Sequence, residues 1–210
     1  MEDFIDVLTL LALLGFWGFV HSFLASLKVK EFFKKQFGKA ISFYRLCYNL
    51  FSIVTLYLIW EYSPHPSTKI YQLNPPFDFL VLIPQMLSLL GIIWCFRFIS
   101  SKEFLGLAQI ERFLNKEYSE EELDEKMTFR IEGPYKYSRH PIYFFSIVFL
   151  LFRAEMDLFY LTVLIVFIAY FYIGSVYEEK KLVTIFGDDY REYQKKVPRI
   201  FPVKLFTKNG

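Results

Sequence analysis

The chain has 210 residues, of which 54% are hydrophobic and 21% are aromatic, and its formal net charge is only +2. This charge excludes the strongly basic surface that is typical of nucleic-acid-binding proteins, so no nucleic-acid partner is expected. The apolar residues are gathered in long blocks, which indicates membrane spans rather than one water-soluble core. We therefore expect an all-α fold, a polytopic membrane helical bundle whose surface contacts membrane lipids.

Apolar runs in the sequence predict about five transmembrane helices. These runs are residues 4–26, 42–61, 78–99, 141–153 and 157–177. The fourth run would rise only about 20 Å as a helix, which is short of the roughly 30 Å hydrocarbon core of a bilayer. Its helix must therefore extend beyond the run, with Pro141 in its first turn, or be shielded by neighbouring helices.

The distribution of Lys and Arg predicts the orientation of these spans. The loops after the first and third runs and the tail are rich in basic residues, whereas the loops after the second and fourth runs are not. The positive-inside rule then places the N-terminus outside and the C-terminus in the cytoplasm. The chain begins with the acidic residues Glu2, Asp3 and Asp6, unlike a cleavable signal, so the first span is expected to stay uncleaved.

We expect residues 1–210 to form a single integral membrane domain. Its parts are three N-terminal spans in 1–99, a cytoplasmic segment in 100–139, a helical hairpin in 140–177 and a cytoplasmic tail in 178–210. These boundaries fall where the apolar blocks give way to polar and charged residues.

Two cytoplasmic segments carry signals of their own. We interpret the acidic stretch 115–127 as a surface helix or a mobile insert. In the tail, apolar residues recur every three or four positions, which predicts an amphipathic helix that lies on the membrane or closes over a site. These residues are Leu182, Phe186, Tyr190, Tyr193 and Val197. Gly187 is expected to break this helix and Asp188 to cap the part that follows.

Charged residues at the two ends of the hairpin form the candidate site. Arg139 and His140 directly precede the fourth run, and Glu178 and Glu179 directly follow the fifth. Taken separately, Arg139 can be a headgroup anchor and the glutamates an ordinary helix exit. In an antiparallel hairpin, however, the end of the fifth helix returns beside the start of the fourth. The four residues would then meet, and charged residues at membrane depth are by default functional.

This grouping has the chemistry of a receptor for a zwitterion. The carboxylates of Glu178 and Glu179 can hold an ammonium group, and Arg139 can hold a carboxylate through two hydrogen bonds. Tyr135 and Tyr143 offer aromatic faces for a sulfonium or a purine ring. A ligand that combines an amino-acid end, a sulfonium and an adenine is S-adenosylmethionine, which we predict as the cofactor.

Three segments carry a family resemblance. They are Gly133-Pro134-Tyr135-Lys136-Tyr137-Ser138-Arg139-His140-Pro141-Ile142-Tyr143 with the later Glu178-Glu179, the tail segment 186–193, and Arg199-Ile200-Phe201-Pro202. Together they resemble the isoprenylcysteine carboxyl methyltransferase superfamily, which also takes in phospholipid N-methyltransferases. The resemblance covers roughly residues 128–202. It implies a multi-pass membrane methyltransferase that uses S-adenosylmethionine.

The resemblance also implies which residues hold the cofactor. These are Gly133, Pro134, Tyr135, Arg139, His140, Pro141, Tyr143, Glu178 and Glu179. The cofactor is expected to enter from the cytoplasm, with the tail covering it, while a small or lipophilic acceptor arrives from the bilayer.

The N-terminal half narrows the branch of the family. Segments 21–26 and 104–110 are similar to the methanethiol S-methyltransferase and NnrU-like branch, although that branch often has a basic residue in place of Ala108. The similarity implies a small thiol or another non-prenylated compound as acceptor. We expect a bacterial inner membrane as the location. His21 is then a candidate for catalysis or substrate contact, or else a packed, hydrogen-bonded residue. Gln109 is a candidate for contact with the cofactor, or else a solvated loop amide.

Methyl transfer from a sulfonium needs alignment of the reacting atoms and exclusion of water, but no protein nucleophile. A thiol acceptor reacts as its thiolate, so a base or a cationic neighbour helps. His140 and His21 are candidates for this role, with Arg139 beside His140. Cys47 and Cys95 lie within apolar runs without metal-ligand spacing, so no metal site is expected.

Other functions stay open from the sequence. The acceptor could instead be a prenylcysteine carboxylate or a phospholipid amine. The chain could also be a non-catalytic NnrU-like membrane protein or a small transporter, although its spans contain few polar residues for a transport path. A related Arg-His motif occurs in membrane sterol reductases, which would bind a nicotinamide cofactor. The oligomeric state is not predicted.

Overall fold

The computed structural model describes residues 1–119, 123 and 128–203. The predicted insert at 115–127 therefore lies largely outside the described residues, as do residues 204–210 of the predicted tail. Most of the described residues are helical and only two short strands occur among them, so the all-α class is confirmed. The chain separates into two compact units, which we describe in turn.

Four helical stretches of the described chain are long and apolar enough to cross a membrane. They are Glu2–Ala25, Leu27–Tyr62, Phe77–Phe96 and Leu158–Lys196. A fifth apolar helix, Pro141–Leu151, has 11 residues and a rise of about 17 Å. It begins at Pro141 and does not extend beyond the predicted run. These lengths support a multi-pass membrane protein in which the fourth predicted span is short.

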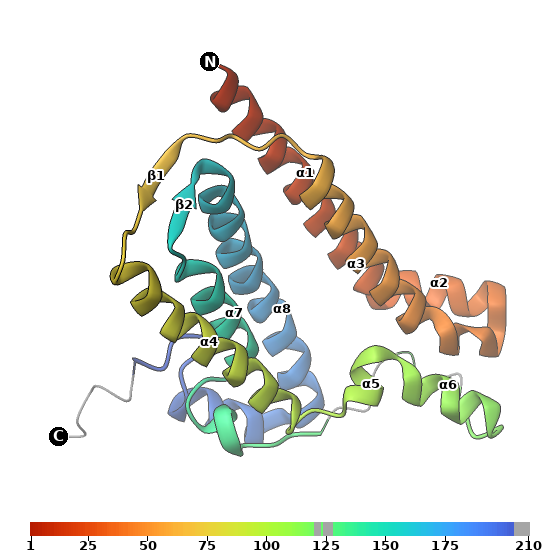
Figure 1. The fold of residues 1–210 in the computed structure, drawn as a ribbon. Coiled ribbons are helices and arrows are strands. Elements are labelled where there is room, and N and C mark those ends of the chain that lie inside the picture. Colours follow the sequence, from red (N-terminus) through yellow and green to blue (C-terminus); the bar gives the residue numbers. More distant parts are fainter. Residues whose placement is uncertain (120–122, 124–127, 204–210) are drawn as a thin grey trace. The chain divides into compact units, whose positions relative to one another are not determined.

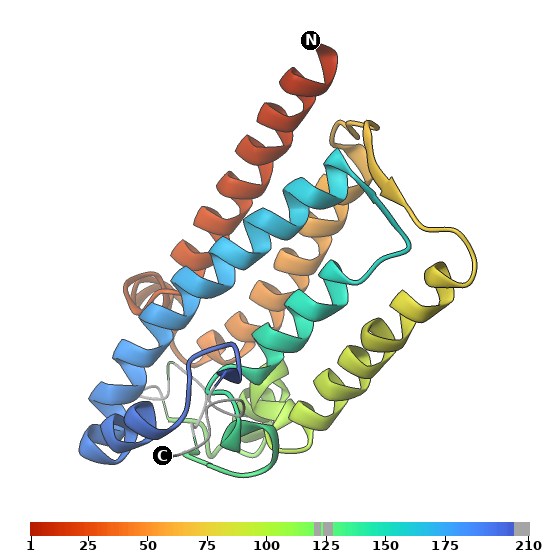
Figure 2. The same cartoon turned by 90° about the vertical axis from the view of Figure 1, so that its left-hand side faces the viewer.

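The first unit is built around this short helix. It comprises residues 1–7, 65–98 and 129–210. Helix α7 (Pro141–Leu151) packs against both α4 (Phe77–Phe96) and α8 (Leu158–Lys196), and Figure 2 shows it between them. Neighbouring helices therefore cover the short helix on two sides, which is the shielding that its length requires.

Close packing of α4 on α7 depends on Gly91. A Cβ atom at this position would lie 2.5 Å from the ring of Phe145 on α7, so a larger residue would force the ring to move. Nearer the other end of α7, the Nε2 atom of Gln85 donates to the carbonyl of Phe149 at 3.2 Å. This bond satisfies one of the last carbonyls of α7, which have no partner within the helix.

Two short paired strands connect the segment that precedes α4 with the segment that precedes α8. Strand β1 (Lys69–Gln72) precedes α4, and strand β2 (Glu155–Asp157) precedes α8. They pair antiparallel, with Gln72 opposite Glu155, and lie side by side in Figure 1. Asp157 then caps α8 by accepting a hydrogen bond from the backbone of Tyr160 at 2.8 Å. Neither strand was predicted from the sequence.

Helix α8 continues through the predicted boundary between span and tail. Glu178 and Glu179 lie inside it, and its regular geometry is broken only at Gly187, where φ is 57° and ψ is −130°. The predicted break is therefore confirmed, and the last part of α8 turns back toward the start of α7 (Figure 1). Asp188 was predicted to cap this part; its carboxylate accepts a hydrogen bond from the Arg191 side chain at 2.7 Å.

The apolar face predicted for the tail packs inside this unit. Buried Tyr190, Tyr193 and Val197 form a cluster with Leu182, Val183, Phe186 and Phe129. All five apolar residues predicted from their spacing belong to this cluster. The face therefore packs against Phe129 and against residues of α8 itself, while its position on a membrane or over a site stays a prediction.

The second unit comprises residues 8–64 and 99–128. It holds most of α1 (Glu2–Ala25), α2 (Leu27–Phe37), the 3₁₀-helix η1 (Gly38–Phe43), α3 (Tyr44–Tyr62), α5 (Ser101–Leu105) and α6 (Leu107–Leu114). Helices α5 and α6 meet at Gly106, whose φ of 91° is left-handed. Arg45 and Asn49 of α3 donate to the carbonyl of Phe104 at 3.0 and 3.1 Å, which anchors this corner.

Candidate functional site

The loop before α7 is held in place by the tail. It contains the 3₁₀-helix η2 (Gly133–Lys136) and ends at His140, the residue before α7. The backbone N–H groups of Arg139 and His140 donate to the carbonyls of Pro198 and Arg199, both at 2.9 Å. The tail beyond α8 thus fixes the backbone that carries the predicted Arg-His pair.

Arg139 and Glu179 form a buried ion pair. Two parallel hydrogen bonds join the guanidinium to the carboxylate, from Nε at 2.8 Å and from Nη2 at 3.0 Å. The Nη1 atom of Arg139 donates to the carbonyls of Gln194 and Val197 at 2.9 and 2.6 Å. These bonds use four of the five N–H donors of the guanidinium. A buried ion pair needs such hydrogen bonds to offset the free-energy cost of removing its charges from water.

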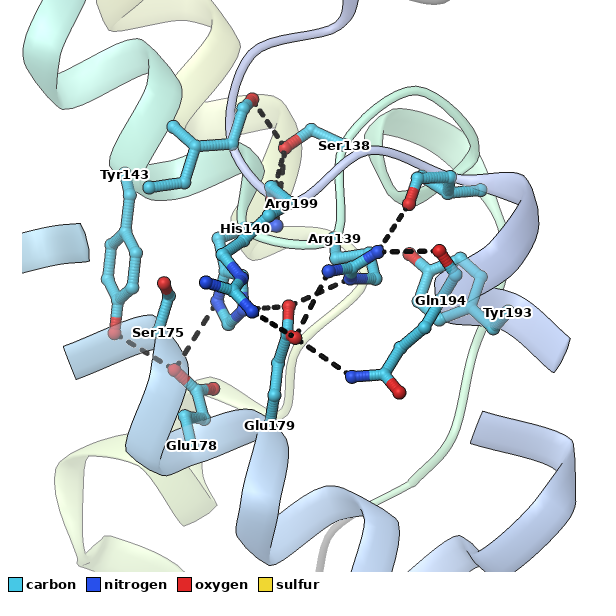
Figure 3. Close-up of polar contacts among 12 residues, drawn as sticks. Ser138, Arg139, His140, Tyr143, Ser175, Glu178, Glu179, Tyr193, Gln194 and Arg199 are labelled. Carbon is cyan, nitrogen blue, oxygen red and sulfur yellow. Dashed lines mark hydrogen bonds and ion pairs between the residues drawn. The ribbon is translucent and has the colours of Figure 1, made fainter. Parts of the chain in front are cut away.

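Glu179 is the centre of the cluster, as Figure 3 shows. Its side chain also accepts hydrogen bonds from Gln194 at 2.9 Å, His140 at 3.2 Å and Arg199 at 3.3 Å. The residue is only 2% exposed. The protein's own donors therefore take up the hydrogen-bonding capacity of this carboxylate.

Glu178 is the carboxylate that reaches solvent, with 40% of its side chain exposed. The hydroxyl of Tyr143 donates to it at 2.9 Å, and Nδ1 of His140 lies 3.4 Å away. His140 thus bridges the two glutamates. Burial alone would lower the pKa of His140, but its hydrogen bonds to Glu178 and Glu179 and their charges raise it above the ordinary value. The imidazolium form is favoured.

The remaining predicted residues of this unit frame the cluster. The ring of Tyr143 stacks with His140 at 5.2 Å and with Phe171 at 4.8 Å between ring centroids. The carbonyl of Tyr135 accepts a hydrogen bond from Tyr193 at 2.6 Å, and burial raises the pKa of the Tyr135 hydroxyl. Both tyrosines are therefore already engaged by the protein.

The small and cyclic residues of the motif shape its backbone. Gly133 has a φ of 54°, and a Cβ there would collide with the ring of Phe98. Pro134 is fully buried, and Pro141 opens α7, where its missing N–H has no helical partner to lose. These residues position the loop rather than contribute charge.

His21 and Gln109, the other predicted site residues, belong to the second unit. His21 Nδ1 lies 2.9 Å from the hydroxyl of Ser52, and His21 Nε2 lies 2.6 Å from the hydroxyl of Tyr48. Because Ser52 donates its own proton to the carbonyl of Tyr48, it accepts from Nδ1, which leaves Nε2 to accept from Tyr48. His21 is thus packed and hydrogen-bonded; its contact with a substrate stays a prediction.

Gln109 is buried rather than solvated, with 4% exposure. Its Nε2 atom donates to Glu103 at 3.0 Å, and Arg112 donates to the same carboxylate at 3.3 Å. Its Oε1 atom is buried and has no hydrogen-bond partner in the part of the chain that the structure describes. The alternative of a solvated loop amide is therefore wrong, while a cofactor contact stays a prediction.

Sequence reasoning missed Gln194 and Arg199 as members of the cluster. Arg199 was noted only as part of the tail pattern, and Gln194 has no distinguishing signal in the sequence. Ser138 was also missed as a tether, although its buried hydroxyl donates to the carbonyl of Ile200 at 2.8 Å. Each of these contacts depends on the return of the chain after Gly187, which a linear pattern does not specify.

No family model matches the chain, and no solved structure matches it. Methanethiol S-methyltransferase 1 of Bradyrhizobium diazoefficiens is 29% identical over 195 residues, which are 91% of this chain and 65% of that protein. Methanethiol S-methyltransferase of Crocosphaera subtropica is 29% identical over 199 residues, which are 90% of this chain and 72% of that protein. Methanethiol S-methyltransferase of Pseudomonas deceptionensis is 39% identical over 75 residues, which are 36% of this chain and 29% of that protein.

The chain thus spans just under two thirds of the first of these relatives, whereas the match covers nearly all of the chain itself. Along about nine-tenths of its length, the chain is similar to proteins named methanethiol S-methyltransferase, which agrees with the branch that its motifs resemble.

Proposed function

We propose that the protein is an S-adenosylmethionine-dependent membrane methyltransferase that methylates the sulfur of a small thiol. The observation that carries this proposal is the charged cluster where α7 begins: Arg139 and His140 lie within 3.4 Å of Glu178 or Glu179. Similarity to proteins named methanethiol S-methyltransferase over most of the chain supports the thiol as acceptor.

The cluster fits the amino-acid end of this cofactor. Glu178 is a partly exposed carboxylate, held in position by Tyr143 and His140, and it suits an ammonium group. The guanidinium groups of the same cluster suit a carboxylate. An internally satisfied ion pair, Arg139 with Glu179, gives the site a rigid base.

The chain's own residues bind and orient in this proposal. When bound, S-adenosylmethionine supplies a methyl group on a positively charged sulfur that is already a good leaving group. The protein has to align the acceptor and exclude water, and the loop before α7, α8 and the tail, which meet at the charged cluster, are proposed to do so. The acceptor thiol reacts as its thiolate, and its proton can be lost to water before the methyl group is transferred, so the proposal assigns no protein base.

His140 is proposed as a positioning residue. Its raised pKa favours the protonated ring, which is poorly suited to removing a proton from a thiol. As a cation between Glu178 and Glu179, it orients both carboxylates and offsets their repulsion. His21 is proposed as a residue that joins α1 to α3 through Tyr48 and Ser52.

We also propose a bacterial inner membrane as the location, with the charged cluster at the cytoplasmic side. Lys180 and Lys181 directly follow the glutamate pair, and basic residues continue along the tail, which supports this orientation. The cofactor would then enter from the cytoplasm.

Purified full-length protein in lipid nanodiscs tests the proposed activity. Labelled S-adenosylmethionine is supplied with a short alkyl thiol, a prenylcysteine or a phospholipid amine, and methylated products are separated. We expect labelled thioether as the main product. If labelled product forms only from the prenylcysteine or only from the phospholipid amine, that compound replaces the thiol as the proposed acceptor. Binding of a nicotinamide cofactor instead of S-adenosylmethionine would overturn the proposal.

A further inference from the structure

Exposure divides the charged cluster into a buried part and an open part. The side chains of Arg139, Glu179 and His140 are 8%, 3% and 4% exposed, whereas those of Arg199 and Glu178 are 30% and 40% exposed. Figure 3 shows these five side chains together. The open part contains one guanidinium and one carboxylate, which is the complement of the carboxylate and ammonium groups of an amino acid.

Arg139 has little left to offer a ligand. Four of its five N–H donors are used within the protein, two by Glu179 and two by carbonyls of the tail. An external carboxylate could engage its Nε and Nη2 edge only by displacing Glu179. That displacement would leave a buried carboxylate without its main partner, which is unfavourable.

Arg199 is held far less completely. Its side chain makes one hydrogen bond among the described residues, from Nη2 to Glu179 at 3.3 Å, the longest of the five bonds to that carboxylate. Its Nε atom is buried and has no hydrogen-bond partner there. A buried donor without an acceptor is unfavourable, so this guanidinium gains more from a new acceptor than Arg139 does.

The backbone of Arg199 is fixed while its side chain is not. Its carbonyl accepts from the N–H of His140 at 2.9 Å and from the hydroxyl of Ser138 at 3.1 Å. Its guanidinium carbon lies 5.5 Å from the centre of the Tyr172 ring, beside the helix that carries Glu178. The backbone of Arg199 is therefore held in place, while its partly exposed guanidinium has few hydrogen bonds to lose.

We propose that Arg199, rather than Arg139, receives the carboxylate of the cofactor's amino-acid group, opposite Glu178, which receives the ammonium. Arg139 is then a positioning residue that ties down the tail on which Arg199 stands. This assignment rests on the proposed use of S-adenosylmethionine, and it adds a ligand-binding role for a residue of the tail.

The test compares ligands that differ only in the carboxylate. Calorimetry of the full chain in nanodiscs measures the affinity for S-adenosylmethionine and for its decarboxylated analogue, in wild type and in Arg199→Gln. We expect wild type to bind the parent compound about 10- to 100-fold more tightly than the analogue. In Arg199→Gln this preference disappears because only the parent compound loses affinity. Arg191→Gln removes an exposed charge from the same tail and should keep the full preference.

Each outcome decides a separate claim. If wild type binds the cofactor and Arg199→Gln keeps the preference, the assignment of Arg199 is overturned while the proposed function stands. Equal weakening of both ligands by Arg199→Gln would likewise reduce Arg199 to a structural role. If wild type binds neither ligand, the proposed function fails and the assignment with it. Should Arg199→Gln not fold, Arg199→Lys keeps the charge without the two-pronged geometry, and the preference should shrink but persist.

Discussion

Arg139 and Glu179 lie 40 positions apart in the sequence, and two hydrogen bonds of 2.8 and 3.0 Å join them with side chains only 8% and 3% exposed. The pair connects the loop before α7 to the middle of α8, and Arg139 also holds the tail through two carbonyls. One ion pair therefore joins three segments around the proposed cofactor site. Its removal should affect folding as well as binding.

Glu179→Ala should destabilise the protein by about 3–5 kcal/mol, because it leaves the guanidinium of Arg139 buried without its carboxylate. Unfolding by denaturant in detergent micelles measures the change. The double variant Arg139→Met with Glu179→Leu should be less destabilised than Glu179→Ala, since no charge is left unpaired. A stability of Glu179→Ala equal to that of wild type would show that the pair does not hold the fold together.

Glu178→Gln should weaken binding of S-adenosylhomocysteine about 10- to 100-fold while leaving the unfolding temperature nearly unchanged. The unfolding temperature should change little because Glu178 is partly exposed and few protein donors depend on its carboxylate. Tyr143→Phe is the matched comparison: it removes one hydrogen bond to Glu178 but keeps the carboxylate, so its loss should be smaller. Calorimetry measures both. Unchanged affinity in Glu178→Gln would remove this residue from the site.

The stability of the protein should fall as the pH rises past neutrality. Burial lowers the pKa of His140, but Glu178 and Glu179 outweigh this effect and raise it. A raised folded-state pKa gives stabilisation that is complete below the unfolded value of about 6.5 and is lost as the pH rises through the folded value. Unfolding temperatures from pH 6 to 9 measure this slope. In His140→Gln the slope should flatten, and parallel curves for both proteins would contradict the linkage.

Gly91→Ala should destabilise the protein by about 1–3 kcal/mol, because its Cβ would lie 2.5 Å from the ring of Phe145. Gly174→Ala on α8 is the control: a Cβ there meets nothing within 4 Å, and alanine favours the helix by up to about 1 kcal/mol. Thermal unfolding of the two variants should therefore move in opposite directions. Addition of Phe145→Leu should recover part of the loss, and no recovery would argue against this contact as the cause.

The meeting of Arg139 and His140 with Glu178 and Glu179 was predictable, because the ends of an antiparallel hairpin lie together whatever its details. The break at Gly187 was predictable as well, since glycine is the residue that most readily leaves the helical region. The first prediction needed only the antiparallel direction of two neighbouring helices, and the second needed only the local sequence pattern.

The internal pairing of the cluster was not predictable from the sequence. The structure pairs Arg139 with Glu179 and the tail carbonyls, contacts that were not predicted from the sequence. That arrangement depends on the direction in which the chain returns after Gly187, which one φ/ψ pair sets. The β1–β2 pairing was missed because strands of four and three residues are too short for a clear alternating pattern.

The decisive measurement is a crystal structure of the full chain with S-adenosylhomocysteine. We expect the ligand's ammonium within hydrogen-bond distance of the Glu178 carboxylate and its carboxylate on Arg199, with the Arg139–Glu179 pair intact. A ligand bound elsewhere, in contact with none of Glu178, His140 and Arg199, would show that the charged cluster is not the cofactor site.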